Sequence, residues 1–289
     1  MNLAPPKIYG LIGHPVRHSF SPAMHNAVFK ALDIKSEYQL FDIKPQDLDY
    51  FLDSMNNNNI YGLNVTIPYK ERILDFVSLD SESFYLGQIR AVNTIVKKGD
   101  IWRGFNTDIP GFSRHLRENV DPANKKVAIL GAGGAARAVT YVLAKSAANE
   151  VAISDIDRKK TEGVASMIKD LFPNFQIYPV DTIEQLNIRS KDLLINATPV
   201  GLKENDRCLV TEEMLHRNLF VYDLIYNPPE TKLLTLARRI GAGFSNGLGM
   251  LVYQGVLSFI HFTGTDAPDS DIVKIMRQAL QVELKRCPT

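Results

Sequence analysis

The sequence predicts an α/β protein of two domains, the second of which is built on a doubly wound parallel sheet. Its 289 residues are many for one hydrophobic core and enough for two domains. After residue 105, short apolar segments alternate with helical patterns, which is typical of a parallel sheet covered by helices on both faces. The first of these apolar segments runs into a glycine-rich turn that joins it to a predicted helix.

The elements of the first domain are bounded by glycine, proline and capping residues. Strands are expected at residues 8–12, 37–43, 63–67, 91–96 and 100–104, and helices at 45–55 and 71–76. The last two strands form a hairpin around Lys98 and Gly99. Ser21 and Pro22 predict the start of another helix, with the serine as its cap and the proline in its first turn. Pro68 is expected to end the third strand, because proline has no N–H for the ladder.

The second domain continues as an alternation of strands and helices. Strands are expected at residues 126–130, 151–154, 175–178, 193–196, 220–224 and 243–245, with helical patterns between most of them. Residues 248–284 are mostly helical by their pattern. The predicted domains are therefore residues 1–105, completed by C-terminal helices at 248–289, and residues 106–247, which hold the parallel sheet.

The turn after strand 126–130 reads Gly131-Ala132-Gly133-Gly134-Ala135-Ala136, a G-x-G-x-x-A pattern. The first glycine permits a tight turn, the second lets the backbone approach a pyrophosphate, and the small third position lets helix and strand pack closely. The helix N-terminus then faces the anion. The pattern predicts a dinucleotide site; the alternative is a tight turn of an α/β fold that binds nothing.

The next strand ends at Ser154-Asp155, where an acidic side chain usually accepts a hydrogen bond from the 2′-OH of an adenosine ribose. A carboxylate at this position repels the 2′-phosphate of NADP, so Asp155 favours NAD. Arg158, Lys159 and Lys160 could instead bind a phosphate, although all three also fit a solvated helix start. Both NAD and NADP stay open as cofactors, with NAD favoured.

Composition excludes several classes of function. Lys and Arg number 33 against 32 Asp and Glu, so no basic face is forced and nucleic acid is not expected as a partner. The longest apolar run, residues 251–262, is too short and too polar to span a membrane. Cys208 and Cys287 imply no disulfide framework and are compatible with a reducing cytoplasm. The histidines lack the spacing of a metal site, so no metal is expected.

Two ionisable residues stand where a ligand is expected. Lys70 closes the segment NVTIPYK, and Asp108 closes GFNTD, where the chain enters the second domain. Ligands of open α/β sheets bind beyond the carboxyl ends of the strands. A lysine oriented by an aspartate can exchange a proton with a substrate hydroxyl. Taken alone, Lys70 also fits a snorkelling surface residue, and Asp108 fits a helix cap before Pro110.

Five segments carry a resemblance to a known family, in that family's order. They are residues 13–26, 64–70, 91–94, 104–111 and 246–254. Together with the glycine turn they resemble the shikimate dehydrogenase family, whose members interconvert 3-dehydroshikimate and shikimate with NAD or NADP. The resemblance implies a substrate-binding first domain, a dinucleotide-binding (Rossmann) second domain and a cleft between them. It also implies a cytoplasmic monomer or homodimer whose partner is the small-molecule substrate.

The resemblance also implies roles for individual residues, beginning with Lys70 and Asp108 as the catalytic pair. Short polar side chains would hold the substrate, at Ser19, Ser21, Asn64, Thr66, Asn93, Thr107, Tyr226 and Gln254. The dinucleotide would lie against Gly131, Ala132, Gly133, Gly134, Ala135, Asp155, Arg158, Thr198, Leu224 and Gly247. Shikimate carries three hydroxyls and one carboxylate, so a site rich in such donors and acceptors suits it.

The sequence departs from the family pattern at two places. Arg90 stands before Ala-Val-Asn-Thr, where the family usually has glycine, and Asp155-Ile156-Asp157 replaces an Asn-Arg-Thr-like segment of its NADP enzymes. The second departure leaves an NAD-dependent quinate/shikimate dehydrogenase of catabolism as an alternative. A dinucleotide-binding regulator without turnover is the alternative from another class.

Overall fold

Two compact units make up the chain in the computed structural model, which describes residues 5–79 and 85–286. The first unit comprises Met1–Thr107 and Val252–Thr289, and the second comprises Asp108–Leu251. The predicted domain boundaries, after residues 105 and 247, lie a few residues earlier in the chain. Cys208 is a free cysteine, and Cys287 lies outside the described residues.

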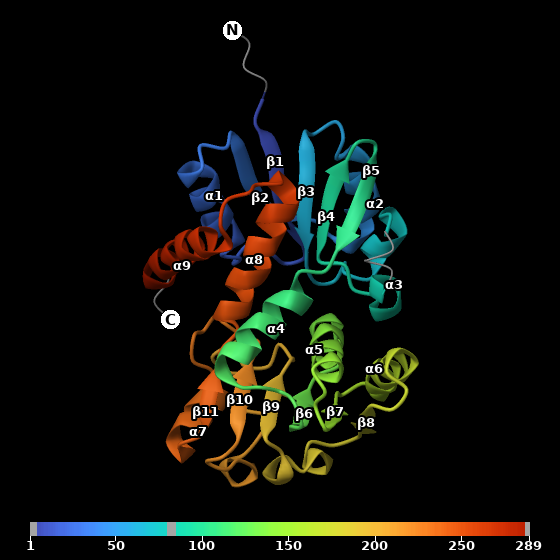
Figure 1. Cartoon of the computed structure of the whole chain (residues 1–289), viewed down its shortest axis with the longest axis vertical. Helices are drawn as coiled ribbons and strands as arrows, with labels where there is room; N and C mark the ends of the chain where they lie inside the picture. The colour runs from blue at the N-terminus through green and yellow to red at the C-terminus, as the bar shows by residue number, and fades with distance from the viewer. Residues whose placement is uncertain (1–4, 80–84, 287–289) are drawn as a thin grey trace. The chain divides into compact units, whose positions relative to one another are not determined.

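A mixed sheet of five strands, counted over the described residues, forms the centre of the first unit in the order β2-β1-β3-β4-β5 (Figure 1). The strands are β1 (Lys7–Gly13), β2 (Ser36–Asp42), β3 (Ile60–Val65), β4 (Thr94–Lys98) and β5 (Ile101–Phe105). β1 pairs in parallel with β2 and β3, whereas β4 runs antiparallel to β3 and β5. The predicted strands and the hairpin are confirmed, with shifted ends at β3 and β4.

Helices pack on this sheet and on one another. They are α1 (Ser21–Ala31), α2 (Leu48–Ser54), α3 (Tyr85–Ile89), α8 (Leu248–Thr263) and α9 (Asp269–Arg286), with the 3-10 turns η1 (Pro45–Asp47) and η2 (Arg72–Phe76). α1 packs against α9, and α8 crosses the face of the sheet (Figure 1). The hydroxyl of Tyr9 in β1 donates to the carbonyl of Phe262 in α8 at 3.1 Å. The helix predicted at 45–55 is divided into η1 and α2, and the helix predicted at 71–76 is a 3-10 turn over Arg72–Phe76.

The predicted end of the third strand is wrong. β3 ends at Val65 rather than at residue 67, because its pairing with β4 stops at Asn64. Ile67 is 71 % exposed, so its β-branched side chain packs on no sheet. Pro68 therefore follows the strand without ending it, and the residues from Thr66 onward form a loop beyond its carboxyl end.

The predicted cap of α1 is also wrong. Ser21 is the first helical residue, and Phe20, which precedes it at the cap position, makes no side-chain cap hydrogen bond. The hydroxyl of Ser19 instead accepts a hydrogen bond from the N–H of Ser21 at 3.2 Å. Pro22 lies in the first turn, as expected, where its missing N–H costs nothing.

Arg90 has a left-handed backbone at the end of α3, with a φ of 52°. Its N–H donates to the carbonyl of Leu86 at 2.8 Å, which closes the helix. A residue with a Cβ pays about 1–2 kcal/mol in this conformation, whereas glycine adopts it without this cost. The guanidinium lies 3.7 Å from the carboxylate of Glu71, the neighbour of Lys70 in the chain.

The second unit is built on a sheet of six strands, again counted over the described residues, in the order β11-β10-β9-β6-β7-β8. The strands are β6 (Lys126–Leu130), β7 (Glu150–Ser154), β8 (Gln176–Val180), β9 (Leu193–Asn196), β10 (Phe220–Asp223) and β11 (Gly243–Ser245). Every pairing is parallel, and the winding direction reverses between β6 and β9. This is the doubly wound order of the Rossmann fold, so the predicted fold class is confirmed.

Helices and short 3-10 turns connect these strands. They are α4 (Asp108–Asn119), α5 (Gly134–Lys145), α6 (Arg158–Leu171), α7 (Lys232–Ile240), η3 (Glu184–Leu186), η4 (Ile188–Ser190) and η5 (Glu212–Met214). Within residues 5–79 and 85–286, no helix is both long enough and apolar enough to cross a membrane.

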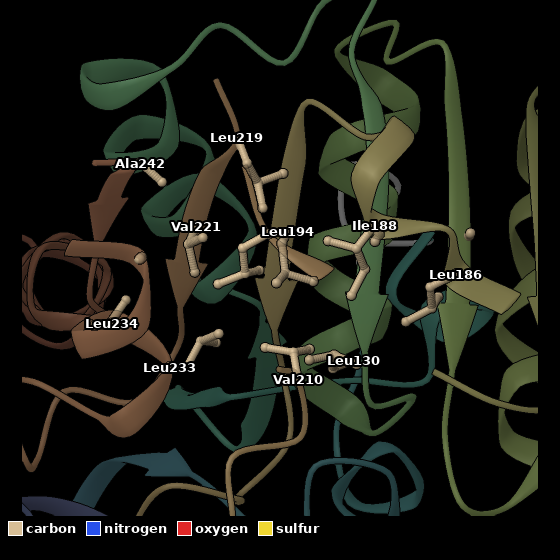
Figure 2. Packing of buried hydrophobic residues seen from close by; sticks show 14 residues of the cluster. Leu130, Leu186, Ile188, Leu194, Val210, Leu219, Val221, Leu233, Leu234 and Ala242 are labelled. Carbon is tan, nitrogen blue, oxygen red and sulfur yellow. The ribbon is translucent and has the colours of Figure 1, made fainter. Parts of the chain in front are cut away.

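The core of the second unit fixes the strands whose carboxyl ends matter for the site. Leu130 of β6, Leu194 of β9 and Val221 of β10 pack in one buried cluster with Leu233 and Leu234 of α7 (Figure 2). Each such side chain contributes about 1.5–3 kcal/mol by leaving water. The strand ends are therefore held by a tightly packed layer directly beneath them.

Candidate active site

The glycine turn lies where β6 passes into α5. Gly131 has a φ of 94°, a left-handed conformation that residues with a Cβ rarely adopt. Its N–H donates to the carbonyl of Ser154 at 2.7 Å, and a Cβ here would lie 2.9 Å from the carbonyl oxygen of Ala197. The backbone itself therefore requires glycine at position 131.

Gly133 differs, because no contact with the described residues requires glycine there. Its φ of −77° and ψ of −171° are open to any residue, and it immediately precedes α5. A Cβ at this position would meet no described atom within 4 Å. The free space lies at a helix N-terminus, where N–H groups and the helix dipole favour an anion. The residues present therefore fit a bound pyrophosphate, which approaches closely where position 133 lacks a side chain.

Asp155 follows the carboxyl end of β7 and stabilises the glycine turn by a hydrogen bond. Its Oδ2 accepts a hydrogen bond from the N–H of Ala132 at 2.8 Å, and its Oδ1 accepts one from the N–H of Asp157 at 2.9 Å. Each carboxylate oxygen keeps a further lone pair for a ligand hydroxyl. The next side chain, Ile156, is fully exposed. The sheet edge at β7 thus presents an oriented carboxylate beside an apolar side chain.

Arg158, the first residue of α6, is paired with two carboxylates. Its Nε donates to Glu162 at 2.7 Å, and its Nη1 donates to Asp181. These hydrogen bonds, that of Glu162 most, raise the pKa of the guanidinium above its ordinary value. All three groups are exposed, so each pair is weak. A phosphate at this position would still have to compete with two carboxylates.

Three further predicted cofactor residues follow the carboxyl ends of β9, β10 and β11. The hydroxyl of Thr198 donates to Asn196 Oδ1 at 2.7 Å, and its methyl group would lie 2.9 Å from a Cβ at Gly131. Gly247 lies against Leu224, because a Cβ at position 247 would lie 2.1 Å from the Leu224 carbonyl oxygen. The structure thus places all three at the same edge of the sheet as the glycine turn.

Two buried polar residues at this edge are missing from the sequence-based set. Asn196 Nδ2 donates to Asp223 Oδ1 at 2.9 Å, and the hydroxyl of Thr231 donates to Asp223 Oδ2 at 2.6 Å. Burial raises the pKa of Asp223, although these hydrogen bonds act in the opposite direction. A polar residue that ends an apolar strand is the sequence signal for both. Tyr226, predicted to bind substrate, lies three residues further on, and burial raises its pKa.

The first unit contains a network of buried amides and hydroxyls. Asn93 Oδ1 accepts a hydrogen bond from the N–H of Thr107 at 2.7 Å, and Asn93 Nδ2 donates to the Thr107 hydroxyl at 3.0 Å. Asn64 Nδ2 donates to the hydroxyls of Thr94, at 3.0 Å, and Ser258, at 2.7 Å. All five side chains are at most 6 % exposed. Thr94 and Ser258 are missing from the sequence-based set; a serine in an apolar helix is the only signal for Ser258.

The network ends on a pair of stacked rings. The hydroxyl of Tyr38 donates to Asn64 Oδ1 at 2.7 Å, and burial raises the pKa of this tyrosine well above its ordinary value. The ring of His25 stacks on Tyr38, with 4.2 Å between centroids and 5° between planes. Neither ring nitrogen of His25 has a hydrogen-bond partner among the described residues, and burial lowers the pKa of His25 to about 3. The imidazole therefore packs as a neutral ring.

The remaining predicted substrate residues of this unit lie near the ends of its elements or on α8. Ser19 precedes α1 and donates its hydroxyl to that of Ser21 at 3.1 Å. Thr66 lies just beyond β3, and its N–H still bonds to a carbonyl of β1 at 2.9 Å. Gln254 lies on α8, and its carbonyl accepts the hydroxyl proton of Ser258 at 2.9 Å. The backbone at Gln254 is thereby joined to the buried network.

The predicted catalytic residues, Lys70 and Asp108, belong to different units. Lys70 is partly exposed beyond β3, and its carbonyl accepts a hydrogen bond from the N–H of Val92 at 3.0 Å, next to Asn93. Asp108 is 8 % exposed and is the first residue of α4, directly after Thr107. Asn93 thus holds Thr107, the last residue of the first unit before α4, in the buried network. The described residues include no group of three or more His, Cys, Asp or Glu placed to hold a metal ion.

Two family models match the chain. Residues 11–95 match the shikimate dehydrogenase substrate binding domain. Residues 247–281 match the shikimate 5′-dehydrogenase C-terminal domain. The first match begins within β1 and ends within β4, and the second covers α8 and much of α9.

Whole-length relatives extend this similarity. A shikimate dehydrogenase (NADP(+)) of Methanopyrus kandleri is 44 % identical over 286 residues, which cover 96 % of each chain. A crystal structure of a shikimate dehydrogenase in complex with NADP+ has a TM-score of 0.86 and 37 % identity, covering 96 % of both chains. Quinate dehydrogenase from Corynebacterium glutamicum in complex with NAD has a TM-score of 0.84 and 31 % identity, covering 94 % of this chain and 99 % of the other. On this similarity, the chain belongs to the shikimate dehydrogenase family.

Proposed function

We propose that this protein catalyses the reversible oxidation of shikimate to 3-dehydroshikimate and uses NAD in preference to NADP. The observation that supports it most is the buried network, which holds Asn64, Asn93 and Thr107 together as hydrogen-bonding groups. The whole-length similarity to a shikimate dehydrogenase supports the same substrate. A ligand with three hydroxyls and a carboxylate needs many short polar groups, and the chain supplies them.

In this proposal the first unit provides most of the substrate contacts. Ser19 and Ser21 receive the carboxylate at the start of α1, where helix N–H groups favour an anion. The hydroxyls of the ring are bound by further polar side chains, at Asn64, Thr66, Asn93, Thr107, Tyr226 and Gln254. The serine hydroxyls are already joined at 3.1 Å, so they form one polar patch.

In this proposal, Lys70 exchanges a proton with the substrate and Asp108 orients Lys70. When the carbinol carbon is oxidised, its hydroxyl loses a proton, which Lys70 accepts in its neutral form. In the reverse direction Lys70 donates that proton to the carbonyl oxygen, and the carboxylate of Asp108 orients the amine. Gly131, Gly133 and Asp155 would hold the dinucleotide, which would supply the hydride acceptor.

The preference for NAD follows from the sheet edge at β7. The carboxylate of Asp155 can accept a hydrogen bond from a ribose 2′-OH and repels a 2′-phosphate. Arg158, a cation that could bind that phosphate, is already paired with Glu162 and Asp181. The Methanopyrus kandleri relative is named for NADP(+), so cofactor choice is where we expect this chain to differ from it.

Quinate is the second candidate substrate. The similarity to an NAD-bound quinate dehydrogenase favours it, as does the expected use of NAD. Quinate carries an additional hydroxyl on the carbon that bears the carboxylate. The paired hydroxyls of Ser19 and Ser21 match the pattern of shikimate-binding enzymes, and they are also compatible with quinate as the substrate.

Initial rates of nicotinamide reduction test the proposal, with shikimate and quinate each offered NAD and NADP. We expect the highest kcat/KM for shikimate with NAD. Faster turnover with NADP contradicts the role given to Asp155, and faster turnover of quinate favours the second candidate. No turnover in any of the four mixtures leaves the fold standing and favours a dinucleotide-binding regulator.

Gly133→Ala is expected to weaken dinucleotide binding by at least about tenfold, because its methyl group occupies the space that a pyrophosphate needs. Its unfolding free energy should stay within about 0.5 kcal/mol of wild type, since the backbone is unstrained and the space is free. Fluorescence titration with NADH and thermal unfolding measure the two quantities.

Gly131→Ala is the matched control and should lose about 1–3 kcal/mol of stability through its left-handed backbone. Wild-type affinity in Gly133→Ala would place the pyrophosphate elsewhere.

A further inference from the structure

We propose that Ser258 is a positioning residue that sets which groups of Asn93 and Thr107 face the substrate as donor and as acceptor. The inference rests on the proposed function, because it assigns a role within the same substrate site. Ser258 lies in α8, far along the chain from the segments that it joins, and its side chain is fully buried.

The hydroxyl of Ser258 has four polar neighbours. They are Asn64 Nδ2 at 2.7 Å, Thr94 Oγ1 at 3.0 Å, Thr107 Oγ1 at 3.0 Å and the carbonyl of Gln254 at 2.9 Å. These groups come from β3, β4, the segment before α4 and the preceding turn of α8. One small side chain therefore joins four segments of the first unit.

The directions of these hydrogen bonds follow from the chemistry of the groups. A hydroxyl has one proton and two lone pairs. The amide nitrogen of Asn64 can only donate and the carbonyl of Gln254 can only accept, so Ser258 accepts from the first and donates to the second. One lone pair of Ser258 remains, and it can accept the hydroxyl proton of either Thr94 or Thr107.

Asn93 supplies the other acceptor for these two threonines. Its Oδ1 accepts the N–H of Thr107 at 2.7 Å and lies 3.1 Å from the hydroxyl of Thr94 and 3.2 Å from that of Thr107. Ser258 and Asn93 Oδ1 thus offer one place each for the two threonine protons, at shorter distances than the 3.3 Å between the two threonine hydroxyls. Both protons therefore stay inside the network. The groups left for a ligand are one N–H of Asn93 and one lone pair of Thr107.

Loss of the Ser258 hydroxyl removes this fixed arrangement of hydrogen-bond donors and acceptors. One threonine proton is then left with the oxygen of the other threonine, at 3.3 Å, as its acceptor, and one N–H of Asn64 is left with the carbonyl of Asn93, at 3.4 Å. Both are long hydrogen bonds in a site where poorly satisfied polar groups are costly. The hydroxyl of Thr107 can then point its proton at a ligand that itself offers a proton. Substrate contacts of this kind are made in ground state and transition state alike, so their loss raises KM more than it lowers kcat.

Ser258→Ala tests the inference through the separation of KM from kcat. We expect the KM for shikimate to rise about tenfold, while kcat and the KM for the dinucleotide stay within about threefold. Calorimetric Kd values for shikimate without dinucleotide should rise in parallel. Thr263→Ala is the matched control: it removes a hydroxyl of the same helix that bonds the carbonyl four residues earlier, at Phe259, at 2.8 Å. Its KM for shikimate should stay at the wild-type value.

An unchanged KM for shikimate in Ser258→Ala overturns the inference, and so does an equal rise in Thr263→Ala. If the alanine variant does not fold, Ser258→Cys keeps the volume with a much weaker acceptor and should show the same rise. Normal wild-type turnover with an unaffected Ser258→Ala leaves the proposed function intact and rejects only the role of Ser258. A wild-type protein that neither binds nor oxidises shikimate rejects the proposed function, and the role of Ser258 with it.

Discussion

Lys70→Ala is expected to lower kcat for shikimate oxidation by at least about 10²-fold, the lower end for losing a general acid–base group. Dinucleotide binding should be retained, because the residues given to the cofactor all belong to the second unit. Lys70 is partly exposed and its backbone is held by the N–H of Val92 at 3.0 Å, so truncation leaves the surrounding fold in place. Steady-state rates and titration with NADH measure the two quantities.

Lys97→Ala is the matched control for this variant. Lys97 is also a partly buried lysine of the first unit, and it lies on β4 with no role in the proposed site. Its removal should change kcat by less than about twofold, as for an ordinary surface substitution. A loss below tenfold in Lys70→Ala, or equal losses in the two variants, contradicts the assignment of Lys70 as the acid–base group.

The strands of the second unit could be predicted from the sequence because several signals coincide there. β6, β9 and β11 begin and end at the predicted residues. β6 and β9 are short apolar runs in a parallel sheet, and β6 runs from a charged residue to a glycine turn, whereas β11 is a partly exposed edge strand. β3 shows the limit of this reasoning. Its end depends on the pairing of Asn64 with Thr94, a partner 30 residues away that no local pattern reveals.

Helix α4 shows a second limit. Pro110 and Gly111 oppose a helix interior, so the pattern indicates only a helix cap at Asp108 and gives no bounds for a helix there. The structure places Pro110 in the first turn, where its missing N–H has no intrahelical partner to lose, and buries Gly111. The left-handed backbone of Arg90 could not be predicted from the local sequence either, because arginine has no preference for a positive φ.

The identity of the site residues and the connections between them come from different sources. The family resemblance points to Asn64, Asn93 and Thr107 as separate side chains. Only the fold shows that Asn64 bonds to Ser258, 194 residues further along the chain, at 2.7 Å. A serine in an apolar helix is also compatible with a simple bond to its own backbone, which Ser258 makes as well. The network therefore cannot be predicted from the sequence, because it forms between segments that are far apart in the chain.

His25 is expected to make the stability of the protein fall steeply with acid. Burial lowers the pKa of the folded imidazole to about 3, whereas the ordinary value is 6.5. Below pH 6.5 the unfolded chain therefore binds a proton at His25, whereas the folded protein does not bind it until the pH approaches 3. The stability that is present above pH 6.5 is therefore lost as the pH falls toward 3. At about 1.4 kcal/mol per pH unit, the unfolding free energy should fall by about 2 kcal/mol between pH 7 and pH 5 through this residue.

His25→Leu separates this titration from all others, because leucine has a similar volume and no proton to gain. Denaturant unfolding at pH 7 and pH 5 should show a loss about 2 kcal/mol smaller in the variant than in wild type. Phe29→Leu is the packing control: this buried ring packs at a tilt against Phe259, with 5.0 Å between centroids, and its loss leaves His25 in place. That variant should be less stable at both pH values and keep the wild-type pH dependence. Equal pH dependence in wild type and His25→Leu would show that water or a polar group reaches the imidazole, and that the stack on Tyr38 does not hold it neutral.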